Sequence, residues 1–160
     1  MTFTPHRPIC LLTLTWVAVL FFMVPAQAGP ITWMGHEEGL AAGKAANKKV
    51  FINFYADWCS WCKKLDKETF RDRAVEDYLK ENFISVKVDS DRRQDLATAY
   101  GVQGLPTLWF VTEQGEPISA LASFVPADTF ITILRYIHTE SYKRMTFADF
   151  AKAQRGKNQP

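Results

Sequence analysis

The feature that most constrains this chain is a pair of cysteines that follows a short apolar segment. Residues 50–55 read VFINFY, and their β-branched and aromatic side chains predict a buried strand. Cys59 and Cys62 come soon after, at the start of a segment whose apolar spacing up to Phe70 predicts a helix with lysines on its polar side. We therefore expect both sulfur atoms to lie where a strand ends and a helix begins.

The rest of the chain alternates between helical and extended patterns and then ends in a strand pair and further helices. This order predicts one α/β domain without repeats or a long linker. Asp72 is expected to cap one helix, Gly101 to close another, and Thr146 with Asp149 to open a last short helix as in a capping box. The predicted helices are 36–47, 59–70, 72–83, 92–101 and 126–137, and the further predicted strands are 83–88, 107–111 and 118–124.

Composition agrees with one globular domain. The chain has 160 residues, of which 48% are hydrophobic and 22% are charged, enough for a real core. The net charge of +2, without a run of like charges, argues against nucleic acid as the main partner.

The first residues have the pattern of a targeting segment. A basic start at Arg7, an apolar run over residues 9–24 and an A-x-A end at Ala28 predict a signal peptide over residues 1–28. The alternative is an uncleaved membrane anchor, but the run is shorter than the roughly 20 residues of a spanning helix. We therefore expect residues 29–160 to form the mature domain, exported to the periplasm or a similar compartment and soluble after cleavage.

Cleavage would remove Cys10 and leave Cys59 and Cys62 as the two cysteines of an exported, oxidised protein. A structural zinc site needs four ligands, and the remaining histidines, His36 and His138, are far apart in sequence and have no neighbouring ligand. We therefore expect no metal and no cofactor.

Two roles remain for the cysteine pair. A structural disulfide that closes so short a loop would stabilise the fold only weakly. A redox-active dithiol has a physical basis, because a cysteine at a helix N-terminus meets unpaired N–H groups and the positive end of the helix dipole, which favour a thiolate. Cys59 would then attack a disulfide, and Cys62, one turn later, would resolve the mixed disulfide.

Two stretches carry a family resemblance. FINFYADWCSWCK resembles the thioredoxin signature, and YGVQGLPTLWF resembles the loop in which that family has a cis-proline facing the dithiol. The resemblance implies an α/β thioredoxin fold, with a central mixed β-sheet flanked by helices and here an extra C-terminal helix. Within the family, the chain is most similar to secreted domains related to the C-terminal domain of the DsbD thiol:disulfide interchange protein.

The resemblance also implies the remaining site residues. Pro106 would follow a cis peptide bond and join the two cysteines as a catalytic residue. Leu105, Trp58 and Trp61 would form the surface that contacts a substrate protein, with Trp61 exposed between the cysteines.

One position departs from the family pattern. Thioredoxins carry a buried aspartate on the strand before the dithiol, as a proton acceptor for the second cysteine, and here that position is Asn53. Asp66, one helical turn after Cys62, matches an acidic position of the DsbD-type domain and is our candidate for this role. The alternative is that Asp66 is a solvated helix charge. Lys87 matches the lysine that pairs with the buried aspartate in thioredoxins, and without that aspartate we expect it to face solvent or to meet Asp66.

The dipeptide between the cysteines bears on the direction of electron transfer. Strong oxidants of this fold carry a histidine there, which stabilises the reduced form, whereas this chain has Ser60 and Trp61. We therefore expect a monomeric reductant of oxidised substrate proteins, recharged by a membrane or periplasmic dithiol donor. The alternatives are an oxidase or isomerase with the same dithiol, and a non-catalytic binding module.

Overall fold

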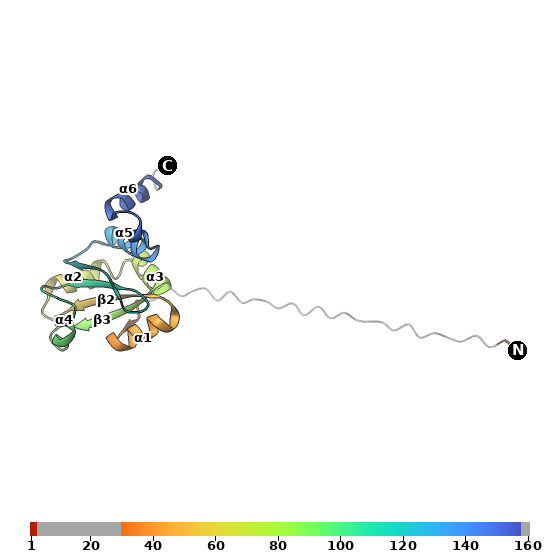
Figure 1. The fold of residues 1–160 in the computed structure, drawn as a ribbon, viewed down its shortest axis with the longest axis horizontal. Coiled ribbons are helices and arrows are strands. Elements are labelled where there is room, and N and C mark those ends of the chain that lie inside the picture. Colours follow the sequence, from red (N-terminus) through yellow and green to blue (C-terminus); the bar gives the residue numbers. More distant parts are fainter. Residues whose placement is uncertain (3–29, 158–160) are drawn as a thin grey trace.

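The computed structural model describes residues 1–2 and 30–157 (Figure 1). The predicted signal peptide and its cleavage site therefore lie almost entirely outside the described residues. The described helices and strands are, in chain order, β1 (Trp33–Met34), α1 (His36–Ala46), β2 (Lys49–Tyr55), α2 (Ser60–Glu68), α3 (Arg73–Asn82), β3 (Phe83–Asp89), α4 (Gln94–Ala99), β4 (Thr107–Val111), β5 (Pro117–Ala122), α5 (Ala127–His138), the 3-10 turn η1 (Ser141–Lys143) and α6 (Phe147–Lys157).

The strands form one mixed sheet in the order β1-β3-β2-β4-β5. β1 and β2 both pair with β3 in parallel, and β2 and β5 both pair with β4 in antiparallel fashion. The central strand β2 is buried along most of its length, which matches its nearly continuous apolar sequence. This is the mixed α/β sheet that the sequence predicts.

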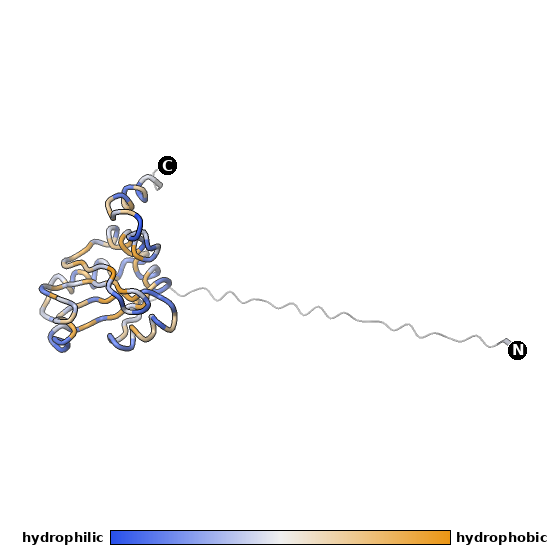
Figure 2. The backbone as a smooth tube through the Cα atoms, in the orientation of Figure 1, coloured by the Kyte–Doolittle hydropathy of each residue, from blue (hydrophilic) through white to orange (hydrophobic). Residues whose placement is uncertain are grey.

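Helices cover both faces of the sheet, with α1 and α4 on one side and α2, α3 and α5 on the other (Figure 1). Val50, Ile52 and Phe54 of β2 point to the α1 side, because side chains alternate along a strand. Phe51 points to the opposite side and packs with Phe110 and Phe130, with ring centroids 5.4 Å away in both cases. Apolar residues accordingly follow the strands, whereas the outer helices are more polar (Figure 2).

Helix α1 lies unusually close to the sheet because two of its residues lack side chains. A Cβ atom built on Gly39 would collide with the side chain of Val86 on β3. A Cβ atom on Gly43 would lie 2.5 Å from Cγ2 of Val50 on β2 and 3.0 Å from the carbonyl oxygen of Lys48. The two glycines, which lower helix propensity, are therefore packing residues in this helix.

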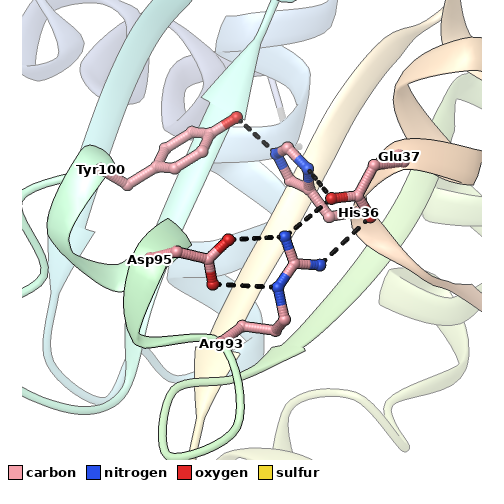
Figure 3. Close-up of polar contacts among 5 residues, drawn as sticks. All are labelled: His36, Glu37, Arg93, Asp95 and Tyr100. Atoms are coloured by element: carbon pink, nitrogen blue, oxygen red, sulfur yellow. Dashed lines mark hydrogen bonds and ion pairs between the residues drawn. The ribbon is translucent and has the colours of Figure 1, made fainter.

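A polar cluster joins the start of α1 to α4 (Figure 3). The guanidinium of Arg93 donates to both carboxylate oxygens of Glu37 at 2.8 and 3.2 Å and to both of Asp95 at 2.9 and 3.0 Å. These hydrogen bonds hold the pKa values of both carboxyl groups at about 2. Beside them, Nε2 of His36 lies 2.9 Å from the hydroxyl of Tyr100. The cluster attaches α4 to the first turn of α1.

The predicted helices and strands are all present, with ends shifted by a few residues. Asp72 accepts a hydrogen bond from the backbone N–H of Val75 and caps α3, as predicted. Thr146 accepts one from the N–H of Asp149 at the start of α6, the predicted C-terminal helix. Strand β1 and the turn η1 were not predicted from the sequence. Within residues 30–157, no helix is long and apolar enough to cross a membrane.

Candidate redox site

The cysteine pair forms a disulfide at the junction between β2 and α2. Cys59 is bonded to Cys62, and their Cα atoms are 5.3 Å apart. Cys59 is the N-cap of α2, and its sulfur accepts a hydrogen bond from the backbone N–H of Cys62 at 3.1 Å. A turn in which the N–H of Cys59 donates to the carbonyl of Ala56 leads into this position. The predicted placement of Cys59 at a helix start is confirmed.

Both cysteines are almost fully covered, with 4% and 3% of their surface exposed. They pack with Ala56, Tyr55 and Leu105. Exposure therefore does not distinguish the two sulfur atoms. The cap geometry does, because only Cys59 Sγ lies at the N-terminus of the helix, where a negative charge is stabilised.

The loop before β4 closes over this pair. The peptide bond between Leu105 and Pro106 is cis, which is the geometry that the resemblance implied. Pro106 is buried, and its carbonyl accepts a hydrogen bond from the N–H of Ser123. The hydroxyl of Thr107 donates to the carbonyl of Gly104 within the loop. The loop therefore has a fixed backbone, and Leu105 packs directly against the disulfide cluster.

Two tryptophans beside the disulfide are exposed. Trp58 is 70% and Trp61 is 54% exposed, as expected for Trp61. The indole N–H of Trp58 donates to Asp91 at 2.9 Å. The Trp61 ring lies 5.8 Å from that of Phe124, and the ammonium of Lys64 lies 5.2 and 4.8 Å from the two ring centres. Phe124, Lys64 and Asp91 were not predicted from the sequence. Phe124 and Asp91 reach the tryptophans through tertiary packing, whereas Lys64 is three residues after Trp61 on α2 and could have been found from helical spacing.

Asp66 forms an ion pair with the sheet below α2. The ammonium of Lys87 donates to its two carboxylate oxygens at 2.9 and 2.8 Å, and the side chain of Asp66 remains 40% exposed. The same ammonium lies 4.6 Å from the ring centre of Tyr55, which also contacts the cysteines. Burial, followed by the charge of Asp89, raises the pKa of Tyr55. Of the two positions considered for Lys87, the structure shows the one next to Asp66.

Asn53 is buried under α2 without a partner for its side-chain oxygen. It is 1% exposed, and its Oδ1 makes no hydrogen bond. Asn53 is two residues after Phe51 on β2, so both side chains point to the side of the sheet that α2 covers, where Cys62 and Leu65 are the buried residues of the helix. A buried carbonyl oxygen without a donor is energetically unfavourable.

The histidines lie elsewhere. His36 belongs to the cluster with Tyr100, and Nδ1 of His138 lies 2.9 Å from the hydroxyl of Tyr78. Burial, followed by the charge of Lys49, lowers the pKa of His138. In the part of the chain that the structure describes, no three His, Cys, Asp or Glu side chains gather as metal ligands.

The structure combines a mixed sheet with a Cys-x-x-Cys disulfide at a helix start and a cis-proline loop beside it. This is the arrangement of a thioredoxin-like domain. Comparison with known proteins agrees: the model of the thioredoxin-like domain family matches residues 37–138. The chain belongs to this family.

Three known proteins illustrate the similarity. The thiol:disulfide interchange protein DsbD of Vibrio vulnificus is 40% identical over 107 residues, which cover 63% of this chain and 18% of DsbD. The C-terminal domain of Neisseria meningitidis DsbD in its oxidised form is 30% identical, with a TM-score of 0.53, covering 65% of this chain and 97% of that domain. A Thermus thermophilus thioredoxin is 25% identical, with a TM-score of 0.63, covering 68% of this chain and 88% of that protein. The chain thus spans less than a fifth of the length of the Vibrio DsbD.

Proposed function

We propose that this protein is an exported thiol:disulfide oxidoreductase that reduces disulfides in other proteins with the Cys59–Cys62 dithiol. The observation that carries the proposal is the position of Cys59 as the N-cap of α2, with its sulfur bound to the N–H of Cys62. The same N–H group and the helix dipole would stabilise a Cys59 thiolate once the disulfide is reduced.

The first step is attack of the Cys59 thiolate on one sulfur of a substrate disulfide. A bond forms between Cys59 and that sulfur, the substrate S–S bond breaks, and the second substrate sulfur leaves as a thiolate, which takes up a proton. The product is a mixed disulfide, and Cys62 is still a thiol.

The second step releases the substrate. Cys62 loses its proton to the Asp66 carboxylate, directly or through a water, and attacks the sulfur of Cys59. The Cys59–Cys62 disulfide forms, and the remaining substrate sulfur leaves with the proton. Cys62 and Asp66 are four residues apart on α2 and so share one helix face, which supports this role. Two electrons have then moved from the protein to the substrate.

Substrate binding is assigned to the surface around the disulfide. Leu105, which precedes Pro106, packs against the cysteine pair, and the exposed rings of Trp58 and Trp61 offer apolar area near it, which supports this assignment. A substrate strand that lies across this surface would bring its disulfide to Cys59.

The proposed direction is reduction. The intervening residues Ser60 and Trp61 offer no cation that would stabilise the Cys59 thiolate beyond the helix terminus, which argues against a strong oxidant. A membrane or periplasmic dithiol protein would return the electrons. Cleavage after Ala28 and a periplasmic, soluble, monomeric state complete the proposal, and N-terminal sequencing of the natively produced protein tests the cleavage.

Equilibration with glutathione tests the direction. A reduction potential below about −200 mV is expected for a reductant, whereas a value near about −120 mV would indicate an oxidant. Trapping tests the roles of the sulfur atoms: Cys62→Ser should accumulate mixed disulfides through Cys59, and Cys59→Ser should accumulate none. Trapping through Cys62 instead would reverse the assignment.

A further inference from the structure

A row of positive charges extends from the redox centre along α2 and the turn that follows it. Lys63, Lys67 and Arg71 are all exposed and, together with Asp66, line a shallow surface depression of about 480 Å³. Lys63 and Lys67 are four residues apart on α2, a spacing that places them on the same side of the helix, and Arg71 follows in the turn after it. The depression adjoins the turn that carries the disulfide, because the N–H of Lys63 donates to the carbonyl of Cys59 at 3.2 Å.

The charge of this row is not balanced within the described residues. Asp66, the acid in the depression, is already bound by Lys87, and Glu68 lies 3.9 Å from Lys64. No acidic side chain in residues 30–157 pairs with Lys63, Lys67 or Arg71. The depression therefore presents a net positive charge to any protein that approaches Cys59.

Two aromatic rings lie on the other side of the helix start, with the ammonium of Lys64 beside them. Trp61 and Phe124 lie with their rings 5.8 Å apart next to the cysteine pair. A partner whose disulfide reaches Cys59 would therefore place one flank over this aromatic pair and the other over the basic row. A nucleic acid would meet the same cations but carries no disulfide for the adjacent site.

We propose that Lys63, Lys67 and Arg71 form a docking surface for acidic residues that flank the exchanged disulfide of a partner protein. This inference rests on the proposed function and specifies the chemistry of its partner. Exposed charges of this kind act mainly by accelerating association, and their effect extends about 10 Å at 0.1 M salt. Lys63 and Lys67 are separated by about 6 Å along the axis of α2, which is within this range.

The test compares two synthetic peptides with the same internal disulfide, one flanked by aspartate and glutamate and one by lysine. The reduced protein is mixed with each peptide in a stopped-flow instrument at about 20 mM and about 500 mM salt, where screening lengths differ about fivefold. The triple variant K63Q/K67Q/R71Q is compared with the control K44Q/R144Q/K152Q, which removes three exposed cations elsewhere.

The acidic peptide should react about tenfold faster than the basic one at low salt, because steering by complementary charge is of this order or larger. The preference should vanish at high salt and in K63Q/K67Q/R71Q but persist in the control. Equal rates for both peptides in the unmodified protein would contradict the proposed docking surface. Equal loss of the preference for the acidic peptide in the two triple variants would contradict it as well.

Absence of any reaction with either peptide would instead contradict the proposed function. Docking is then measured separately with the acidic peptide in which serine replaces cysteine. Binding by the unmodified protein, weakened at least threefold in K63Q/K67Q/R71Q and not in the control, supports the surface. Equal binding by all three proteins overturns it.

Discussion

The ammonium of Lys87 donates to both carboxylate oxygens of Asp66, at 2.9 and 2.8 Å. Lys87 is on β3 and Asp66 is on α2, so the pair joins the sheet to the helix that begins at the redox disulfide. The interaction holds the Asp66 carboxylate in place one turn beyond Cys62. This position is the basis for assigning Asp66 as proton acceptor.

Asp66→Asn should slow release of the mixed disulfide about 100-fold near neutral pH, because an amide cannot accept the proton of Cys62. The first attack by Cys59 should be nearly unchanged, and the defect should shrink at high pH, where Cys62 ionises unaided. Stopped-flow release rates measure this effect. Glu68→Gln removes a carboxylate from the same helix and serves as the control. If the release rates of Asp66→Asn and the unmodified protein coincide between pH 6 and 8, Asp66 is only a surface charge and does not accept the proton of Cys62.

Asn53→Leu should stabilise the oxidised protein by about 1 kcal/mol or more, because it replaces a buried amide whose oxygen has no donor by an apolar side chain of similar size. Urea unfolding under non-reducing conditions gives the free energy of unfolding. A loss of stability of this size would show that the amide has a partner in solution, such as an ordered water.

Gly39→Ala should destabilise the protein by about 1–3 kcal/mol, because its new methyl group would collide with Val86 and push α1 from the sheet. Without that contact, alanine in a helix would stabilise by about 1 kcal/mol. Gly156→Ala in α6 is the matched control, because a Cβ atom there meets nothing within 4 Å. Thermal or urea unfolding distinguishes the two. Gly39→Ala with unchanged stability would mean that α1 shifts without cost.

Stability should fall in acid as the carboxylates around Arg93 are protonated. The pKa values of Glu37 and Asp95 are about 2 in the folded protein, below their ordinary values of 4.5 and 3.8. Their contribution is therefore present above about pH 4.5 and lost as the pH falls toward 2. Arg93→Gln should make the unfolding free energy depend less on pH in this window. Arg73→Gln, which breaks an exposed ion pair with Asp77, is the control. An unchanged pH profile in Arg93→Gln would contradict the assignment.

The order of helices and strands and the place of the disulfide were predictable from the sequence. Apolar periodicity over residues 50–55 and from Cys59 to Phe70 is a local signal, and it located the strand, the helix and the N-cap cysteine between them. The caps at Asp72 and Thr146 were predictable for the same reason, since a cap and its N–H partner are three residues apart.

The tertiary structure decided the features that join residues distant in the chain. A strand of two residues has no period, so β1 became evident only from its pairing with β3. The sequence also could not show that Gly39 lies against Val86, because that contact depends on how closely α1 approaches the sheet.

The sequence by itself determined that the cysteine pair lies at the start of a helix that follows a strand, because Cys-x-x-Cys spacing and a helix start are local properties. Only the folded chain decided their surroundings. The fold pairs the Lys87 ammonium with the Asp66 carboxylate and buries the side-chain oxygen of Asn53 without a hydrogen-bond donor. It also exposes the basic row of Lys63, Lys67 and Arg71. The physical reason is that ion pairing and burial depend on which elements pack together, and no single segment of the sequence contains that information.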